Sequence, residues 1–162
     1  MDCITLAILV SISQVWGAVT AVPMSVEVIR MKAIVEAKSK QLVARLNKIQ
    51  VPPGMTLTPP ADRLDGLSSV VTLLDGYDKL ISDSLNVSQV KAEISWLKSY
   101  LGQWKKGRCG EAKANRTSAT GGALQRLQSQ RSFVLTVGIE ALVRVKDILT
   151  RMLQNMEHLD KC

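Results

Sequence analysis

The chain has 162 residues, of which 46% are hydrophobic and 22% charged, and this balance excludes a disordered or collagen-like protein. Aromatic residues make up only 4% and do not gather in short alternating runs, so an all-β fold is disfavoured. One histidine, His158, and three cysteines cannot build a His/Cys metal cluster, and we expect no metal, no cofactor and no catalytic site. The net charge of +7 raises the question of whether the partner is a nucleic acid, a membrane or another acidic surface.

The first 21 residues have the layout of a secretory signal peptide. An apolar run begins at Ile4, and Val19 and Ala21 occupy the −3 and −1 positions of a cleavage site after Ala21. The run is too short for a transmembrane span, although it lacks the usual Lys or Arg at its start, so a buried N-terminal helix is the alternative. We expect a secreted protein with one mature domain at residues 22–162, in which the loss of Asp2 raises the net charge to +8.

Two features of the expected mature chain are typical of proteins that pass through the secretory pathway. Cys109 and Cys162 are its two cysteines, and an extracellular location favours one disulfide over two free thiols or an intermolecular bond. Asn86 and Asn115 begin N-glycosylation sequons. Asn86 also resembles a helix-capping residue, because Gln89 follows three positions later, and this is a competing interpretation of the same asparagine.

Residues 25–49 and 67–85 are predicted to form the first two helices, because apolar residues recur at intervals of three and four. Pro52 and Pro53 end the first helix. Gly76 makes the second helix the least secure, since glycine costs about 1 kcal/mol relative to alanine inside a helix. The positions expected to face the core are Val28, Met31, Val35, Leu42, Leu46 and Ile49, then Leu67, Val70, Val71, Leu74, Tyr77, Ile81 and Leu85.

Residues 87–106 and about 133–158 are predicted to form the other two helices, with a short helical piece near 123–128 between them. The third helix is expected to end at Lys105-Lys106-Gly107, which leaves Cys109 in the following loop. The positions expected to face the core are Val87, Val90, Ile94, Leu97, Leu101 and Trp104, then Val134, Leu142, Val145, Leu149, Met152, Met156 and Leu159.

The connections between the expected helices are long, short and long. Residues 51–66 hold four prolines and two glycines, the link at 84–86 is short, and residues 106–122 are rich in Gly, Lys, Ser and Thr. A short link makes neighbouring helices antiparallel, whereas a long link can cross the length of a bundle. We therefore predict an all-α, up-up-down-down four-helix bundle of the long-chain cytokine type with two long crossover loops.

Several segments resemble the leptin family, in a divergent form like that of bony fishes. Residues 42–49, LVARLNKI, are similar to the family's I-V-T-R-I-N-D-I, and residues 86–90, NVSQV, are similar to its N-V-I-Q-I. Cys109 and the terminal Cys162 match the positions of the family's single disulfide. The resemblance implies a secreted, monomeric hormone that binds and activates a class I cytokine receptor, signals through JAK/STAT and acts in energy balance and feeding.

The resemblance also implies two receptor-contacting regions. The main docking face of the family lies on the first and third helices, where Arg45 and Gln89 are matching positions and Lys40 and Gln41 are adjacent candidates. The activation region takes in the first long loop and the start of the last helix. Its corresponding residues are Gly54, Met55, Leu57, Pro59 and Thr136, with Thr56 in place of the family's Asp.

Helix geometry independently marks one flank of the third helix. At about 100° per residue, Gln89, Glu93, Trp96 and Tyr100 form a continuous strip beside the core-facing stripe. Tryptophan and tyrosine are enriched at interface hot spots, so we expect this strip to contact a receptor. The alternative is that the two aromatic side chains widen the core.

Three other functions are alternatives to a receptor-binding hormone of the leptin family. Another long-chain helical cytokine of the growth-hormone or interleukin-6 type would have the same architecture but usually carries more than one disulfide. A secreted amphipathic lipid-binding protein would have repeated units with wide apolar faces, and no repeat is present. Secretion removes nucleic acid as a target, and we expect no membrane insertion of the mature chain.

Overall fold

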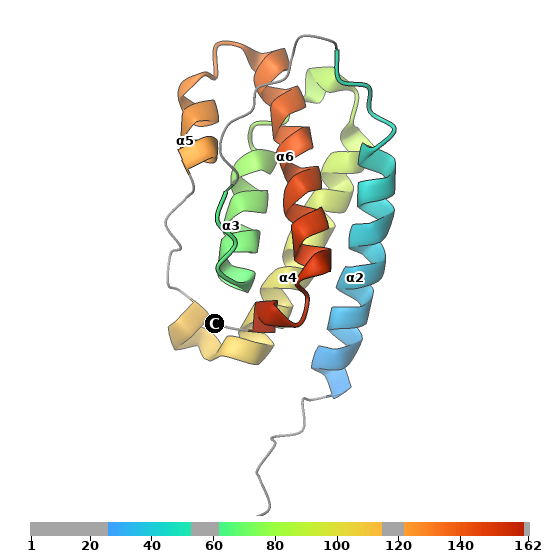
Figure 1. The fold of residues 1–162 in the computed structure, drawn as a ribbon, viewed down its shortest axis with the longest axis vertical. Helices are drawn as coiled ribbons and strands as arrows, with labels where there is room; N and C mark the ends of the chain where they lie inside the picture. Colours follow the sequence, from blue (N-terminus) through green and yellow to red (C-terminus); the bar gives the residue numbers. More distant parts are fainter. Residues whose placement is uncertain (1–25, 53–61, 115–121, 161–162) are drawn as a thin grey trace, which may run out of the picture.

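The computed structural model describes residues 26–52, 62–114 and 122–160 (Figure 1), and all regular structure in these ranges is helical. The helices are α2 (Val26–Leu46), α3 (Leu67–Asp78), α4 (Ser88–Ala114), α5 (Gly122–Ser129) and α6 (Val134–Gln154), with short 3-10 helices η1 (Asp83–Leu85) and η2 (His158–Asp160).

Four of these helices form a bundle with up-up-down-down direction. In Figure 1, α2 and α3 run one way along the long axis, and α4 and α6 run the other way. Both α2 and α3 pack against α4 and α6, so each helix of one pair lies beside both helices of the other. The shorter α5 lies in the connection between α4 and α6 and packs on α3. The predicted four-helix bundle with two long crossovers is confirmed.

A continuous apolar core fills the space between the four helices. Helix α4 follows the predicted pattern closely, since Ile94, Leu97, Leu101 and Trp104 are all at most 1% exposed. Ser39 occupies a place in the apolar stripe of α2 and is completely buried. Apart from Val134, the predicted core positions are buried or packed against this core.

Two predicted helix ends are wrong. Helix α3 ends at Asp78, and the chain then turns into η1, where the side chain of Ser82 accepts a hydrogen bond from the backbone N–H of Ser84 and so competes with the helical ladder. Helix α4 continues past Gly107 to Ala114, so Cys109 lies within a helix and not in a loop. Glycines weaken a helix without necessarily ending it, and the segment that holds Gly107 and Gly110 also contains the helix formers Arg, Glu, Ala and Lys.

Two glycines allow close packing around the bundle. Gly76 of α3 lies directly beneath Leu124 of α5, where a β-carbon would collide with the leucine. A β-carbon at Gly138 of α6 would lie 2.6 Å from the Leu85 side chain. The glycine that weakens the second predicted helix is therefore the contact point for α5.

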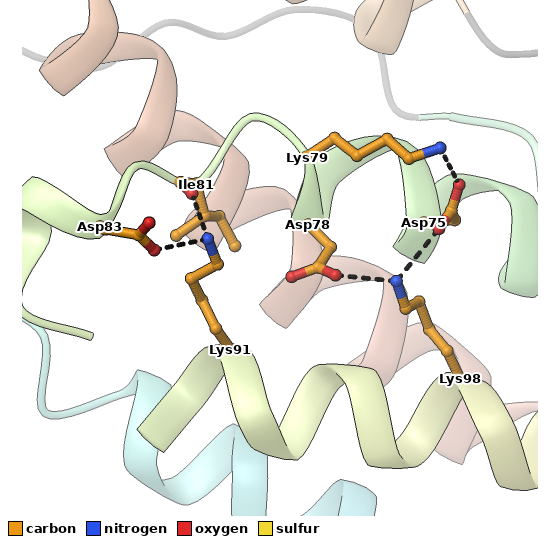
Figure 2. A network of polar contacts seen from close by, with 7 residues as sticks. All are labelled: Asp75, Asp78, Lys79, Ile81, Asp83, Lys91 and Lys98. Carbon is orange, nitrogen blue, oxygen red and sulfur yellow. Dashed lines mark hydrogen bonds and ion pairs between the residues drawn. The ribbon is translucent and has the colours of Figure 1, made fainter. Parts of the chain in front are cut away.

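One flank of α4 is joined to the α3 side of the bundle by ion pairs (Figure 2). Lys98 Nζ donates to Asp75 Oδ1 at 3.0 Å and to Asp78 Oδ2 at 2.7 Å, and Lys79 Nζ contacts Asp75 Oδ2 at 2.6 Å. Burial of the Lys98 ammonium opposes its charge, but the hydrogen bonds to Asp78 and Asp75 still raise the pKa of Lys98 above its usual value. This flank is therefore committed to contacts within the chain.

The same flank extends to the turn before α4. Lys91 Nζ reaches Asp83 Oδ1 at 2.8 Å and the carbonyl oxygen of Ile81 at 3.1 Å (Figure 2). Both partners precede α4 in the chain, so a single side chain of α4 holds the turn that leads into the helix.

Candidate functional site

A cleft of about 370 Å³ lies between α2 and α4, on the flank of α4 that α3 leaves uncovered. The residues that line it are Lys38, Gln41, Gln89, Ala92, Glu93, Trp96 and Leu97. The cleft thus combines long polar side chains with one large aromatic side chain, a composition suited to recognition of another protein.

The aromatic part of the cleft is held in place by its neighbours. The Trp96 and Tyr100 rings stack with their centroids 3.9 Å apart and their planes inclined by 27°. The ammonium of Lys38 lies 5.5 Å from the Trp96 ring centroid, within the range of a cation–π interaction. Both rings are half-buried and pack against the core, so the two aromatic residues widen the core and also present a surface.

An ion pair connects the two helices at the same flank. Arg45 NH2 of α2 lies 3.1 Å from Glu93 Oε1 of α4, and the two side chains are 34% and 26% exposed. Arg45 Nε and Glu93 Oε2 are buried and have no hydrogen-bond partner among the described residues. Buried polar atoms without partners are uncommon and costly.

The structure brings together all but one of the expected docking residues. Gln41, Arg45, Gln89, Glu93, Trp96 and Tyr100 share the α2–α4 flank. Lys40 does not lie there: it is exposed, pairs with Glu36 at 2.7 Å and does not line the cleft.

Lys38, which the sequence did not single out, lines the cleft, whereas Lys40 does not. Residues 38, 41 and 45 are three and four positions apart and therefore share one face of α2, whereas Lys40 is about 200° away from Lys38. The same periodicity that identified the strip on α4 could have selected Lys38 on α2.

The start of α6 carries an apolar surface that the sequence did not predict. Phe133, Val134 and Leu135 are 67%, 49% and 54% exposed, although Val134 was expected to face the core. The half-buried Thr136 follows directly and is the described member of the expected activation region. These exposures show that the described residues leave much of the first turn of α6 uncovered.

Several expected site residues lie outside the described residues, namely Gly54, Met55, Leu57, Pro59, Asn115, Cys162 and the cleavage site after Ala21. Cys109 is disulfide-bonded, but its partner is outside the described ranges, so the Cys109–Cys162 pairing stays a prediction. Asn86 is described and exposed.

A second polar cluster lies inside the bundle between α3 and α6. Tyr77 donates its hydroxyl to Asp62 Oδ2, and Arg144 Nε pairs with Glu140 Oε1 at 2.9 Å. Burial, followed by the hydrogen bond to Asp62, raises the pKa of Tyr77 above its usual value. These side chains fill the interior and do not line the α2–α4 cleft, so we assign them to stability.

Two kinds of site are not found in the described parts of the chain. No three His, Cys, Asp or Glu side chains gather closely enough there to hold a metal ion. Among the helices of those parts, none combines the length and the apolar character needed to cross a membrane.

The up-up-down-down bundle with two long crossovers places the molecule among the long-chain helical cytokines. No family model and no solved structure matches the chain. Two fish proteins do: it is 38% identical to leptin of Tetraodon nigroviridis over 161 residues, 98% of each chain. It is also 36% identical to leptin of Takifugu rubripes over 140 residues, 85% of this chain and 84% of the other.

The chain therefore belongs to the leptin family, which confirms the resemblance seen in its sequence segments. It is a leptin-like hormone and not an enzyme, since leptins are hormones. This decides between the leptin family and the other helical cytokines that share the architecture.

Proposed function

We propose that this hormone is secreted after cleavage behind Ala21 and that residues 22–162 act as a monomer. In this proposal it binds and activates a class I cytokine receptor of the leptin-receptor type, signals through JAK/STAT and contributes to the control of energy balance and feeding. The observation that carries the proposal is the α2–α4 cleft with its Trp96–Tyr100 stack, together with the similarity to fish leptins.

The docking face comprises Lys38, Gln41, Arg45, Gln89, Glu93, Trp96 and Tyr100. A tryptophan already held by Tyr100 and Lys38 loses little conformational freedom on binding, and such pre-organised aromatic residues are typical hot spots. Around the cleft, Lys38 and Arg45 outnumber Glu93, and the whole chain carries +7. The excess positive charge favours an acidic receptor surface and would speed association.

The activation region comprises Thr136 and the loop residues Gly54, Met55, Leu57 and Pro59, as the family resemblance implies. The exposed Phe133 and Leu135 beside Thr136 support this assignment, because a contiguous apolar surface on a soluble protein often marks a contact with another protein.

The proposal is tested with Trp96→Ala and a matched control, Ser95→Ala. Both residues lie on α4, but Ser95 is exposed and does not line the cleft. We expect Trp96→Ala to weaken binding to the leptin-receptor ectodomain by about 1–3 kcal/mol, measured as a higher Kd by surface plasmon resonance, while Ser95→Ala leaves the Kd unchanged. Because Trp96 also packs on the core, a modest fall in melting temperature is expected as well.

Two results would remove parts of the proposal. If Trp96→Ala and Lys38→Glu both bind the receptor like the parent, the α2–α4 cleft is not the docking face. If the mature protein gives no response at saturating dose in cells that carry the receptor and a STAT reporter, activation of this receptor class is wrong.

A further inference from the structure

The sequon at Asn86 has both of its reactive groups free in the folded protein. Asn86 is exposed, and its side-chain amide makes no hydrogen bond within the described residues. Ser88, the first residue of α4, is also exposed, and its hydroxyl has no partner there. The competing interpretation of Asn86 as a cap for α4 is therefore wrong, since such a cap would accept a hydrogen bond from the first turn of α4; Asn86 instead ends η1 as its C-cap.

The backbone around Asn86 presents the side chain outward. Asn86 has φ 53° and ψ 34°, a left-handed conformation that asparagine tolerates better than most residues, and its N–H bonds the Asp83 carbonyl at 3.2 Å. Its neighbours point inward: Leu85 packs on Gly138, and Val87 packs against the core. An oligosaccharide on Asn86 would extend away from the bundle without disturbing it.

The turn is also held firmly from α4. Lys91 binds both Asp83 and the carbonyl of Ile81 (Figure 2), so the position of Asn86 relative to α4 is set by contacts on either side of it. The left-handed backbone explains the asparagine, but no contact in the described structure explains a serine at position 88.

Asn86 lies close to the docking face. Three residues separate it from Gln89, at most about 10 Å of chain, and Gln89 lines the α2–α4 cleft. We propose that Asn86 carries an N-linked oligosaccharide and that this oligosaccharide stands at the α4 end of the cleft, where it slows receptor association. The attachment depends on the proposed secretory route, and its effect on association depends on the proposed docking face.

The attachment is an ordinary group transfer in the secretory pathway. The Asn86 amide nitrogen loses a proton and forms a bond to the anomeric carbon of the first N-acetylhexosamine. The bond from that carbon to a polyprenyl pyrophosphate donor breaks, and the pyrophosphate leaves with the bonding electrons. The Ser88 hydroxyl is the recognition element for the transferring enzyme.

The test uses the full chain with its own first 21 residues, expressed in vertebrate cells in a Thr117→Ala background that removes the second sequon. We expect the secreted protein to shift in mobility on treatment with peptide N-glycosidase, and peptide mass spectrometry in heavy-oxygen water to place the label at position 86. Ser88→Ala should abolish the shift and Ser88→Thr should preserve it.

The outcomes separate this inference from the proposed function. A secreted chain that is unmodified at Asn86 overturns the site while the hormone proposal stands. A chain that never enters the secretory route overturns both the site and the signal peptide. If the glycosylated form and Ser88→Ala associate with the receptor at equal rates, the placement beside the docking face is wrong.

Discussion

The hydroxyl of Tyr77 donates a hydrogen bond to the buried carboxylate of Asp62, which lies at the end of the first long connection. Removing this hydroxyl measures how much the hydrogen bond contributes to the free energy of unfolding. Tyr77 is completely buried and Asp62 is 3% exposed. The Tyr77 hydroxyl donates to Asp62 Oδ2, and Asp62 Oδ1 has no hydrogen-bond partner among the described residues. Arg151 NH1 of α6 contacts the Asp62 backbone carbonyl at 2.7 Å but not its carboxylate.

The Tyr77→Phe variant keeps the ring and removes the one hydrogen bond that the carboxylate receives from a described residue. A hydrogen bond to a charged group contributes about 1.5–3 kcal/mol, and a buried acceptor left without its donor also loses its solvation. The missing oxygen leaves little empty space, so a cavity adds little to the cost. We expect Tyr77→Phe to lower the free energy of unfolding by about 2–3 kcal/mol.

The assay is urea unfolding followed by circular dichroism, in a double-mutant cycle with Asp62→Asn. In the neutral Asp62→Asn background, Tyr77→Phe should cost only about 1 kcal/mol, because a neutral hydrogen bond contributes less. A cost below about 0.5 kcal/mol in the parent, or an equal cost in both backgrounds, would refute the reasoning.

Three further predictions follow from the same interior. Since the pKa of Tyr77 is raised in the folded state, its contribution to stability should be constant below the unfolded value near 10 and fall as pH rises beyond it; thermal melts of Tyr77→Phe should show a smaller fall, with the part due to the raised pKa of Lys98 remaining. Gly138→Ala should lower the free energy of unfolding by about 1–3 kcal/mol in urea titrations because its β-carbon meets Leu85, whereas Gly102→Ala, with open space, should raise it by about 0.5–1 kcal/mol. Ser39→Ala should raise the melting temperature, since the buried Ser39 hydroxyl has no partner among the described residues and its removal recovers about 1 kcal/mol; a lower melting temperature would mean that the hydroxyl is satisfied after all.

Helical periodicity and connection length predicted the architecture because both depend on local sequence. Ile94, Leu97 and Leu101 fall on one face of any helix that contains them, and that face is buried in α4. The direction of the helices followed from the long, short and long connections, since a short link between α3 and α4 makes them antiparallel.

The sequence predictions are wrong where tertiary contacts or competing local hydrogen bonds determine the structure. The end of α3 depends on a hydrogen bond from the backbone of Ser84 to the side chain of Ser82, and periodicity does not register such a bond. Lys40 stays a predicted docking residue that no observation tests, but the cleft takes residues from one face of α2, and this face contains Lys38 and not Lys40. Val134 fits the apolar pattern, yet it is 49% exposed, and periodicity carries no information about which turns of a helix have neighbours.

The two flanks of α4 have different roles: the Lys98 flank holds α3 by ion pairs, and the Trp96 flank forms part of the proposed docking face. Trp96 and Lys98 are two residues apart and therefore point in directions about 200° apart around the helix. Lys98 is bound to Asp75 and Asp78 of α3, so a partner on that side would have to break existing ion pairs. Trp96 lines the cleft, packs against the core, and contacts the side chains of Lys38 and Tyr100. Binding at the Trp96 flank therefore adds contacts without losing any of the ion pairs that hold α3 to α4, and this asymmetry is the physical reason for placing the docking face between α2 and α4.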